Sequence, residues 1–486
     1  MTSNDLPPDR RRLTRVTSDR AKVATLAGTG LVAAFMQTLV TPVFPELPQL
    51  LDTTAADASW VLTSTLLAAA ISTPISGRLG DMYGKRRIML VLLSIMTLGS
   101  VLAALSTTLI PMIVARSLQG IGLGVIALGI SILRDVVHPR ALGGAIALVS
   151  ATLGIGGALG LPIAAIVAQS VDWHFLFVLA AALGIVAIVL VAVVIPVSTL
   201  RTGGRFDLPG ALGLGVGLVG ILLGISKGSE WGWTSPITLA LLVGGVAVLV
   251  LWGAFELRTR DALIDLRVAA RRPVLLTNLA SIAVGFAFFV CSASLPILLE
   301  SPSSTGVGFA LPLLIASLCL MPLGLVMFFT SPLAARLTTS RGARTSFLLG
   351  MVIIAATFAA GVFLTDQVWH VILISTFVGF GVGFAYAAMP NLIMSAVPPT
   401  ETAAANGLNS VMRTLGSTLA ATIVGLILSS NAVIADGISI PTREGFQIVF
   451  GMGAGVMVVA VVIAFFIPKR SNRYDDTASI PVQPAQ

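Results

Sequence analysis

The segment Gly77-Arg78-Leu79-Gly80-Asp81-Met82-Tyr83-Gly84-Lys85-Arg86-Arg87 connects two long apolar runs, 58–77 and 88–107. Gly84 suits a sharp turn that needs a positive φ angle, and the two earlier glycines predict close helix packing. The basic residues that follow the turn indicate the edge of a membrane, where cations contact headgroups. Asp81 stands out, because it is an acid surrounded by cations.

Apolar runs of this kind fill the whole chain. A membrane-spanning helix needs about 20 mostly apolar residues, whereas a soluble domain carries roughly 25 % charged residues. Here 56 % of the residues are hydrophobic and 10 % are charged. The sequence therefore predicts an all-α integral membrane protein embedded in lipid, with fourteen transmembrane helices. They are expected near 23–43, 58–77, 88–107, 109–133, 141–168, 174–196, 208–226, 236–256, 275–298, 308–334, 345–364, 368–395, 403–429 and 446–468.

The positions of Lys and Arg predict the orientation. All but four of the 29 basic residues lie in the two tails or in alternate loops, on one side of the predicted spans. The four others are Arg116, Lys227, Arg413 and Arg443. Positive loops stay in the cytoplasm, so both termini are expected there, in a multi-pass protein of the inner (plasma) membrane. The loop before span 13 is the weak point, since it has Glu401 and no basic residue.

Several classes of protein do not fit. The formal charge of +8 sets membrane topology, and no soluble basic domain is present to bind nucleic acid. The apolar run after the basic tail is a full span rather than a signal peptide. Cys291 and Cys319 both fall inside spans, and the three histidines are scattered. We therefore expect no metal site, no disulfide and no cofactor.

The chain divides into two groups of six spans with two spans between them. Such internal repetition is common in transporters, whose substrate site lies between the repeats. G-x-x-x-G spacings at 213–217 and 220–224 predict helix packing in the central pair. The expected units are a basic cytoplasmic tail (1–22), an N-terminal six-helix bundle (23–196), linkers with an inserted helical hairpin (197–272), a C-terminal six-helix bundle (273–468) and a disordered cytoplasmic tail (469–486).

Three further motifs accompany the first segment. Span 4 contains Arg116-Ser117-Leu118-Gln119-Gly120-Ile121-Gly122. Span 5 contains Gly154-Ile155-Gly156-Gly157-Ala158-Leu159-Gly160-Leu161-Pro162, and span 13 contains Asn409-Ser410-Val411-Met412-Arg413-Thr414-Leu415-Gly416. In the second half, the loop from Arg336 to Arg344 keeps a glycine and basic residues but has no acid.

Together these motifs resemble those of the major facilitator superfamily, specifically its fourteen-span drug:proton antiporter (multidrug efflux) branch. The first segment is similar to the G-x-L-x-D-x-x-G-R-[RK] loop of that family, and the span 4 motif to its R-x-x-Q-G-x-G. The span 5 motif looks like the antiporter motif, but Leu161 interrupts its Gly-Pro pair and Ala164-Ala165 replace its closing glycines. The resemblance implies the major facilitator fold, with helix packing at Gly120, Gly154, Gly156, Gly157, Gly160 and Pro162.

The resemblance also implies a conformational latch formed by Gly77, Asp81, Gly84 and Arg86. Asp81 would dock on the N-terminus of span 13, since carboxylates are stabilised near helix N-termini, and hold the outward-facing state. Charges buried in hydrocarbon are candidates for function, and Arg116 and Arg413 fall within spans. Many relatives have an acid in span 1 where this chain has Met36 and Gln37. We therefore expect Glu46, at the end of span 1, to take part in proton coupling, opposed by Arg116; the alternative is a solvated loop acid.

The predicted function is secondary active transport: proton-coupled export of lipophilic drugs or toxic compounds by alternating access. No Walker-type nucleotide motif is present, and a monomer is expected. The cavity residues would be Phe35, Met36, Gln37, Trp60 and Gln119. One alternative is a dedicated exporter of a lipid, siderophore or endogenous metabolite with an acidic group, which Arg116 and Arg413 would meet. A membrane-embedded enzyme would need a His–Asp or Ser–His constellation, which His138, His174 and His370 do not suggest.

Overall fold

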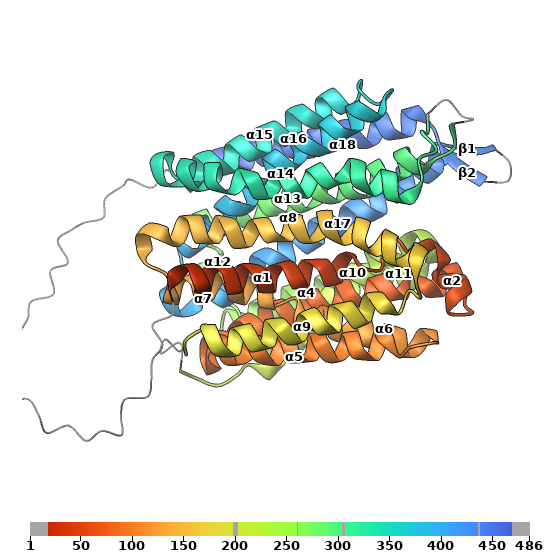
Figure 1. Cartoon of the computed structure of the whole chain (residues 1–486). Coiled ribbons are helices and arrows are strands. Elements are labelled where there is room, and N and C mark those ends of the chain that lie inside the picture. Colours follow the sequence, from red (N-terminus) through yellow and green to blue (C-terminus); the bar gives the residue numbers. More distant parts are fainter. Residues whose placement is uncertain (1–17, 198–202, 260, 304–306, 436–437, 469–486) are drawn as a thin grey trace, which may run out of the picture.

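The computed structural model describes residues 18–197, 203–259, 261–303, 307–435 and 438–468. Its long helices run side by side, and a small β-hairpin marks one end of the molecule (Figure 1). We call this the hairpin end. The opposite end, where α1 (Asp19–Thr38) begins and α18 (Arg443–Phe465) finishes, is called the tail end.

Thirteen helices in the described ranges are long and apolar enough to cross a membrane. That set counts the segment Leu109–Val136 as one span. Helix α1, at the first predicted span, falls outside the set because polar residues such as Lys22 and Gln37 make it less apolar. The predicted all-α membrane fold is therefore confirmed. Span 1 was predicted to run to residue 43, but α1 ends at Thr38, ahead of Pro42 and Pro45, which cannot donate a helical hydrogen bond.

The first half contains one helix for each predicted span except span 4. That span is divided at Leu123–Gly124 into two shorter helices. Short helical turns fill the loop after α1: η2 (Phe44–Glu46), α2 (Leu47–Leu50) and α3 (Ala55–Ala58). After α1, the long helices of this half are α4 (Trp60–Tyr83), α5 (Lys85–Ala104), α6 (Leu109–Gly122), α7 (Val125–Val136), α8 (Pro139–Ser170) and α9 (Phe175–Val194).

The second half repeats the pattern and adds the only strands of the described ranges. Strands β1 (Ala432–Ala435) and β2 (Ile438–Pro441) pair antiparallel, with Ala432 opposite Pro441. The short helices are α12 (Leu266–Ala269) and η4 (Pro399–Glu401). Before α18, the long helices are α13 (Arg272–Glu300), α14 (Leu313–Arg341), α15 (Ala343–Gly361), α16 (Val368–Met394) and α17 (Thr402–Ser430).

Each half has its own apolar core, built around residues such as Met96 and Phe177 in the first half and Phe358 and Phe450 in the second. The halves meet where α8 packs on α14 and where α4 packs on α17. Close backbone approach explains part of this contact, because a Cβ on Gly77 would collide with the backbone of α17. The two halves therefore touch along two separate seams.

The inserted hairpin consists of α10 (Leu208–Trp231) and α11 (Pro236–Glu256). Leu214, Leu218 and Leu222 of α10 share a buried apolar cluster with Ala70 of α4 and Val411 of α17. Helix α10 therefore covers the α4–α17 seam. Helix α11 lies outside it and exposes large apolar side chains, among them Val243, Val250 and Leu251, as expected for a surface that faces lipid.

Candidate functional site

A buried ionic cluster joins the two halves at the tail end. Both backbone N–H groups of Ala403 and Ala404 donate to Asp81 Oδ2, at 3.1 and 3.0 Å. Lys85 Nζ lies 3.8 Å from Asp81 Oδ1 and 3.0 Å from Asp135 Oδ2, and it donates to Thr402 Oγ1 at 3.2 Å. The cluster thus links the ends of α4, α5 and α7 to the first turn of α17.

Helix geometry explains why an acid belongs at this position. The first N–H groups of a helix have no partner within the helix, and the helix dipole adds partial positive charge there. Asp81 satisfies two such groups of α17 while only 1 % of its surface is exposed. Charge-assisted hydrogen bonds of this kind contribute roughly 1.5–3 kcal/mol. Opening this seam would leave Asp81 and Lys85 without partners in α17.

The structure places the four predicted latch residues at different points. Asp81 lies on the start of α17, Gly77 packs against Ala403 and Ala404, and Gly84 has a φ angle of 105° at the α4–α5 turn. Arg86 was expected beside Asp81, but its guanidinium donates to Ala192 O near the end of α9. The cation beside Asp81 is Lys85.

Sequence reasoning did not assign Lys85 and Asp135 to the latch. Lys85 is part of the first motif, and Asp135 follows Arg134 at the end of span 4, so the sequence shows both as charged residues near the ends of spans. Their pairing connects residues 50 positions apart, and the Lys85–Thr402 bond connects residues 317 apart. No local pattern indicates such contacts.

A central cavity of about 170 Å³ lies between the two halves. It is lined by helices α1, α4, α7 and α8 of the first half and by α13, α14, α16 and α17 of the second. Arg413 is the charged residue of this lining, and its Cζ lies 4.8 Å from the ring centre of Tyr386. The cavity is mostly apolar, with hydroxyl and amide groups from Gln37, Thr414 and Ser417.

The predicted cavity residues divide into one that lines this cavity and four that do not. Gln37 is exposed to it. Phe35 and Met36 are buried in the core of the first half. Trp60 lies at the hairpin end, where Lys227 Nζ is 5.0 Å from its ring centre. Gln119 is buried, with Arg116 and Ser100 as its hydrogen-bond partners.

Arg116 and Glu46 do not form the expected pair. Arg116 is 1 % exposed and donates from Nη1 to Met36 O at 3.1 Å and to Gln119 Oε1 at 2.6 Å. Glu46 is exposed in the short turn η2 at the hairpin end. Arg116 therefore connects α6 to the backbone of α1 and is closed off from the central cavity.

The predicted packing residues lie at helix contacts of several kinds. Gly120 faces the backbone of α4 at Thr65, and Gly154 faces Met327 of α14. Gly156 and Gly160 face α1, whereas Gly157 has only an ordinary contact with Thr38 and lines the cavity. Pro162 lies inside α8.

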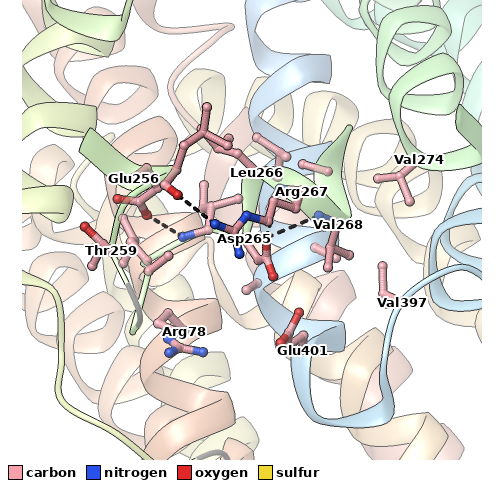
Figure 2. A pocket seen from close by; sticks show the side chains of 18 of the residues that line it. Arg78, Glu256, Thr259, Asp265, Leu266, Arg267, Val268, Val274, Val397 and Glu401 are labelled. Carbon is pink, nitrogen blue, oxygen red and sulfur yellow. Dashed lines mark hydrogen bonds between the residues drawn. The ribbon is translucent and has the colours of Figure 1, made fainter. Parts of the chain in front are cut away.

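A second cavity, of about 270 Å³, lies beside the ionic cluster at the tail end. Figure 2 shows Arg78, Glu401 and Glu256 around it, below and beside the short segment that carries Asp265. Glu256 Oε1 accepts from Ile264 N at 2.7 Å, and Asp265 caps α12 by accepting from Arg267 N and Val268 N. This cavity carries charges of both signs, so it has no single preference for cations or anions.

The described residues include no group of three or more His, Cys, Asp or Glu that could hold a metal ion. One His–Asp contact is present, since His174 Nδ1 lies 2.5 Å from Asp172 Oδ1 at the hairpin end. Hydrogen bonds from the backbone and ring of His174 lower the pKa of Asp172. The other ring nitrogen faces the carbonyl oxygen of Ser106, not a hydroxyl, so the contact lacks the nucleophile that hydrolytic chemistry needs.

Comparison with known proteins shows the family. A sequence model of the Major Facilitator Superfamily matches residues 26–205, 208–421 and 323–481. The chain therefore belongs to this superfamily of membrane transporters, which are not enzymes.

Individual relatives agree with this assignment. The chain is 26 % identical to Multidrug resistance protein 3 of Bacillus subtilis over 378 residues, which are 76 % of this chain and 72 % of that protein. It is 28 % identical to the puromycin resistance protein pur8 of Streptomyces alboniger over 473 residues, covering 92 % and 91 %. The crystal structure of the human organic anion transporter MFSD10 superimposes with a TM-score of 0.65 at 15 % identity, covering 94 % of this chain and all of that chain, and supports the fold alone.

Proposed function

We propose that this protein exports lipophilic drugs or toxic compounds across the plasma membrane, driven by protons that move inward. The observation that carries the proposal is the mostly apolar central cavity between two halves that an ionic cluster joins at the tail end. Apolar cavities with few polar groups suit lipophilic ligands. The names of the multidrug resistance relatives support the same class of cargo.

Alternating access would then follow from opening and closing the two seams. In the form described here, Asp81 and Lys85 hold α4 and α5 on the first turn of α17. We propose that this cluster is the latch of the outward-facing state, with the tail end in the cytoplasm. Transport requires the latch to open, so that the cavity can accept cargo from the other side.

Proton coupling needs a group, usually a carboxyl group, that binds and releases a proton during the cycle. No Asp or Glu is among the described residues that line the central cavity. Glu46 is exposed at the hairpin end, within the loop that follows α1. We keep Glu46 as the proposed proton-binding residue, acting without Arg116 as its partner.

The test is the pH change that a panel of lipophilic dyes produces in everted membrane vesicles. Proton-coupled export predicts alkalinisation of the vesicle lumen when a transported dye is added. Glu46→Gln should reduce this change at least about tenfold, since an amide cannot carry a proton. Asp57→Asn, which removes another exposed acid at the same end, is the matched control. Intact dye-driven pH changes in Glu46→Gln would exclude Glu46, and their absence in the wild type would exclude proton coupling.

A second candidate keeps the mechanism and changes the cargo to an endogenous metabolite, siderophore or lipid with an acidic group. Arg413 favours it, because the described residues that line the cavity include this cation and no acid. Growth of a deletion strain on a panel of toxic compounds separates the two. Broad sensitisation supports drug export, and unchanged sensitivity supports a dedicated exporter.

A further inference from the structure

We propose that the central cavity recognises its cargo by an anionic group, which Arg413 binds while Tyr386 holds the guanidinium in position. This inference rests on the transport function proposed above and names the chemical class of compound transported. Carboxylates, sulfonates and phosphates share the required chemistry, and the attached body would be apolar.

The first argument is the charge of the cavity. One positive charge, on Arg413, faces the cavity, and the lining residues of the described structure contribute no carboxylate. A charge inside the hydrocarbon region is costly unless it is paired or meets water or a ligand. The lining therefore disfavours lipophilic cations and favours anions.

The second argument is the free hydrogen-bonding capacity of Arg413. A guanidinium carries five N–H donors. In the described part of the chain, Arg413 makes one side-chain hydrogen bond, from Nη2 to Ser410 Oγ at 3.5 Å, and no salt bridge. Arginine binds carboxylate and phosphate oxygens in pairs, and Arg413 has the donors left to do so.

The third argument is that the position of Arg413 is fixed. Its guanidinium carbon lies 4.8 Å from the ring centre of Tyr386, within the range of a cation–π contact. Tyr386 is buried in α16, with its ring near that of Phe288. The backbone of Arg413 contacts Gly285 of α13, where a Cβ would collide with it. The charge is thus held in the cavity by two neighbouring helices.

Arg116 shows what a purely structural arginine looks like in the same protein. Its Nη1 bonds to Met36 O and Gln119 Oε1 hold it within the core of the first half, away from the cavity. Within the described part of the chain, Arg413 has no comparable partners. The difference assigns ligand binding to Arg413 and helix connection to Arg116.

The remaining lining predicts the rest of the ligand. Hydroxyl groups lie close to Arg413 in sequence, at Ser410, Thr414 and Ser417, and Gln37 contributes an amide from α1. Apolar surface comes from Leu153, Phe288 and Met327, among others. A compact amphipathic anion fits this arrangement, with its acidic group on Arg413 and its apolar body against the aromatic and aliphatic side chains.

The test is counterflow in proteoliposomes that contain the full-length protein. The probes are fluorescein, an anion at pH 8, and rhodamine 123, a cation with the same ring system. Wild-type protein should exchange fluorescein at least about tenfold faster than rhodamine 123. Arg413→Gln should remove this preference, whereas Arg443→Gln, at an exposed arginine paired with Asp366, should keep it. The ratio of the two rates is measured within one preparation, so a loss of folded protein does not affect it.

Arg413→Lys and two Tyr386 variants keep the test decisive if Arg413→Gln does not fold. Lysine retains the charge, so Arg413→Lys should keep the anion preference with a weaker apparent affinity. Tyr386→Phe retains the ring and should behave like the wild type, whereas Tyr386→Leu should raise the KM for fluorescein several-fold without abolishing exchange. Equal effects of Phe and Leu would exclude Tyr386 as a positioning residue.

The outcomes separate the inference from the proposed function. Exchange of rhodamine 123 as fast as fluorescein in the wild type, or an unchanged ratio in Arg413→Gln, would overturn the inference and leave transport standing. Protein that exchanges neither dye, and binds neither in fluorescence anisotropy, would overturn both.

Discussion

The two halves of the protein carry equivalent turns at the tail end, and the turns differ in one property. The α4–α5 turn contains Gly84 with φ 105°, and the α14–α15 turn contains Gly342 with φ 88°. The arginine two residues after each glycine is also equivalent, because Arg86 donates to Ala192 O in the last turn of α9 and Arg344 donates to Phe465 O at the end of α18. Turn geometry and this helix-end contact are therefore repeated.

Among the described residues, the ionic cluster is not repeated at the second turn. Three residues before the glycine, the first turn has Asp81, which is buried against α17, and the second has Thr339, which is exposed. Thr339 Cγ2 lies 3.7 Å from the position of a Cβ on Gly143 near the start of α8, so it occupies the corresponding place on the other seam. Lys85 corresponds to Ala343. The comparison teaches that one seam carries a buried ionic cluster, whereas the described residues of the other seam meet through small and apolar side chains.

The largest expected effect comes from removing the latch charge. Asp81→Asn should lower transport at least about tenfold and shift the protein toward the form that is open at the tail end, because a charge-assisted bond to a helix N-terminus is worth roughly 1.5–3 kcal/mol. The measurement is maleimide labelling of a cysteine at Ser410 in the cavity, from each side, in protein lacking Cys291 and Cys319. Asp366→Asn, in an exposed ion pair, is the control. Labelling like that of the wild type from both sides would remove the latch from the mechanism.

The two glycines test which property each turn needs. Gly84→Ala and Gly342→Ala should each cost about 1–3 kcal/mol of stability, because both require a φ angle that alanine rarely adopts. Thermal unfolding should therefore shift similarly in both variants. Transport should fall more in Gly84→Ala, since that turn also positions Lys85 beside Asp81. An equal loss of transport in Gly342→Ala would contradict the proposed difference between the turns.

A new acid should give the second seam a weak latch. Thr339→Asp places a carboxylate near the start of α8, where the helix dipole stabilises it by roughly 0.3–1 kcal/mol. We expect a shift of about two- to fivefold toward the form closed at the tail end, measured by the same cysteine labelling. Thr339→Asn, which lacks the charge, should leave the labelling unchanged. A shift of the same size with asparagine would show that charge is not the cause.

The smallest expected effect concerns the feature that both turns share. Arg86→Gln and Arg344→Gln should each lower stability by about 1 kcal/mol or less, because each removes a cation from a helix C-terminus. The two variants should have equal melting temperatures, a few degrees below the wild type. Arg87→Gln, at an exposed neighbour, should have no effect. Unequal losses would indicate that the equivalence of the two turns is incomplete.

Much of the fold could be predicted because a membrane helix is recognised from the length and hydropathy of one continuous stretch of sequence. Length and hydropathy located the helix, or in span 4 the pair of helices, at each of the fourteen predicted spans. The motif around Asp81 placed the carboxylate near the start of α17 through a resemblance. The division of span 4 at Leu123–Gly124 was not predicted, since both pieces are equally apolar. The end of α1 was misplaced because hydropathy continues through Val40 and Val43, although the helix does not.

The site was less predictable, because the surroundings of each charged residue depend on partners that lie far away in the sequence. Arg116 and Arg413 have similar sequence settings, each inside an apolar span. Only packing shows that Arg116 is enclosed by Met36 and Gln119 and that Arg413 faces a cavity. Likewise, nothing next to Lys85 indicates that it, rather than Arg86, approaches Asp81.

The sequence by itself determined that this chain is a membrane protein of many helices, because apolar length and the placement of charge are local properties that a bilayer imposes on any segment. The tertiary structure alone decided which charged residues are enclosed, which join the two halves in the ionic cluster and which face the cavity. These outcomes depend on contacts between residues up to 323 positions apart, and the energy of a buried charge is set by whichever groups the fold brings beside it.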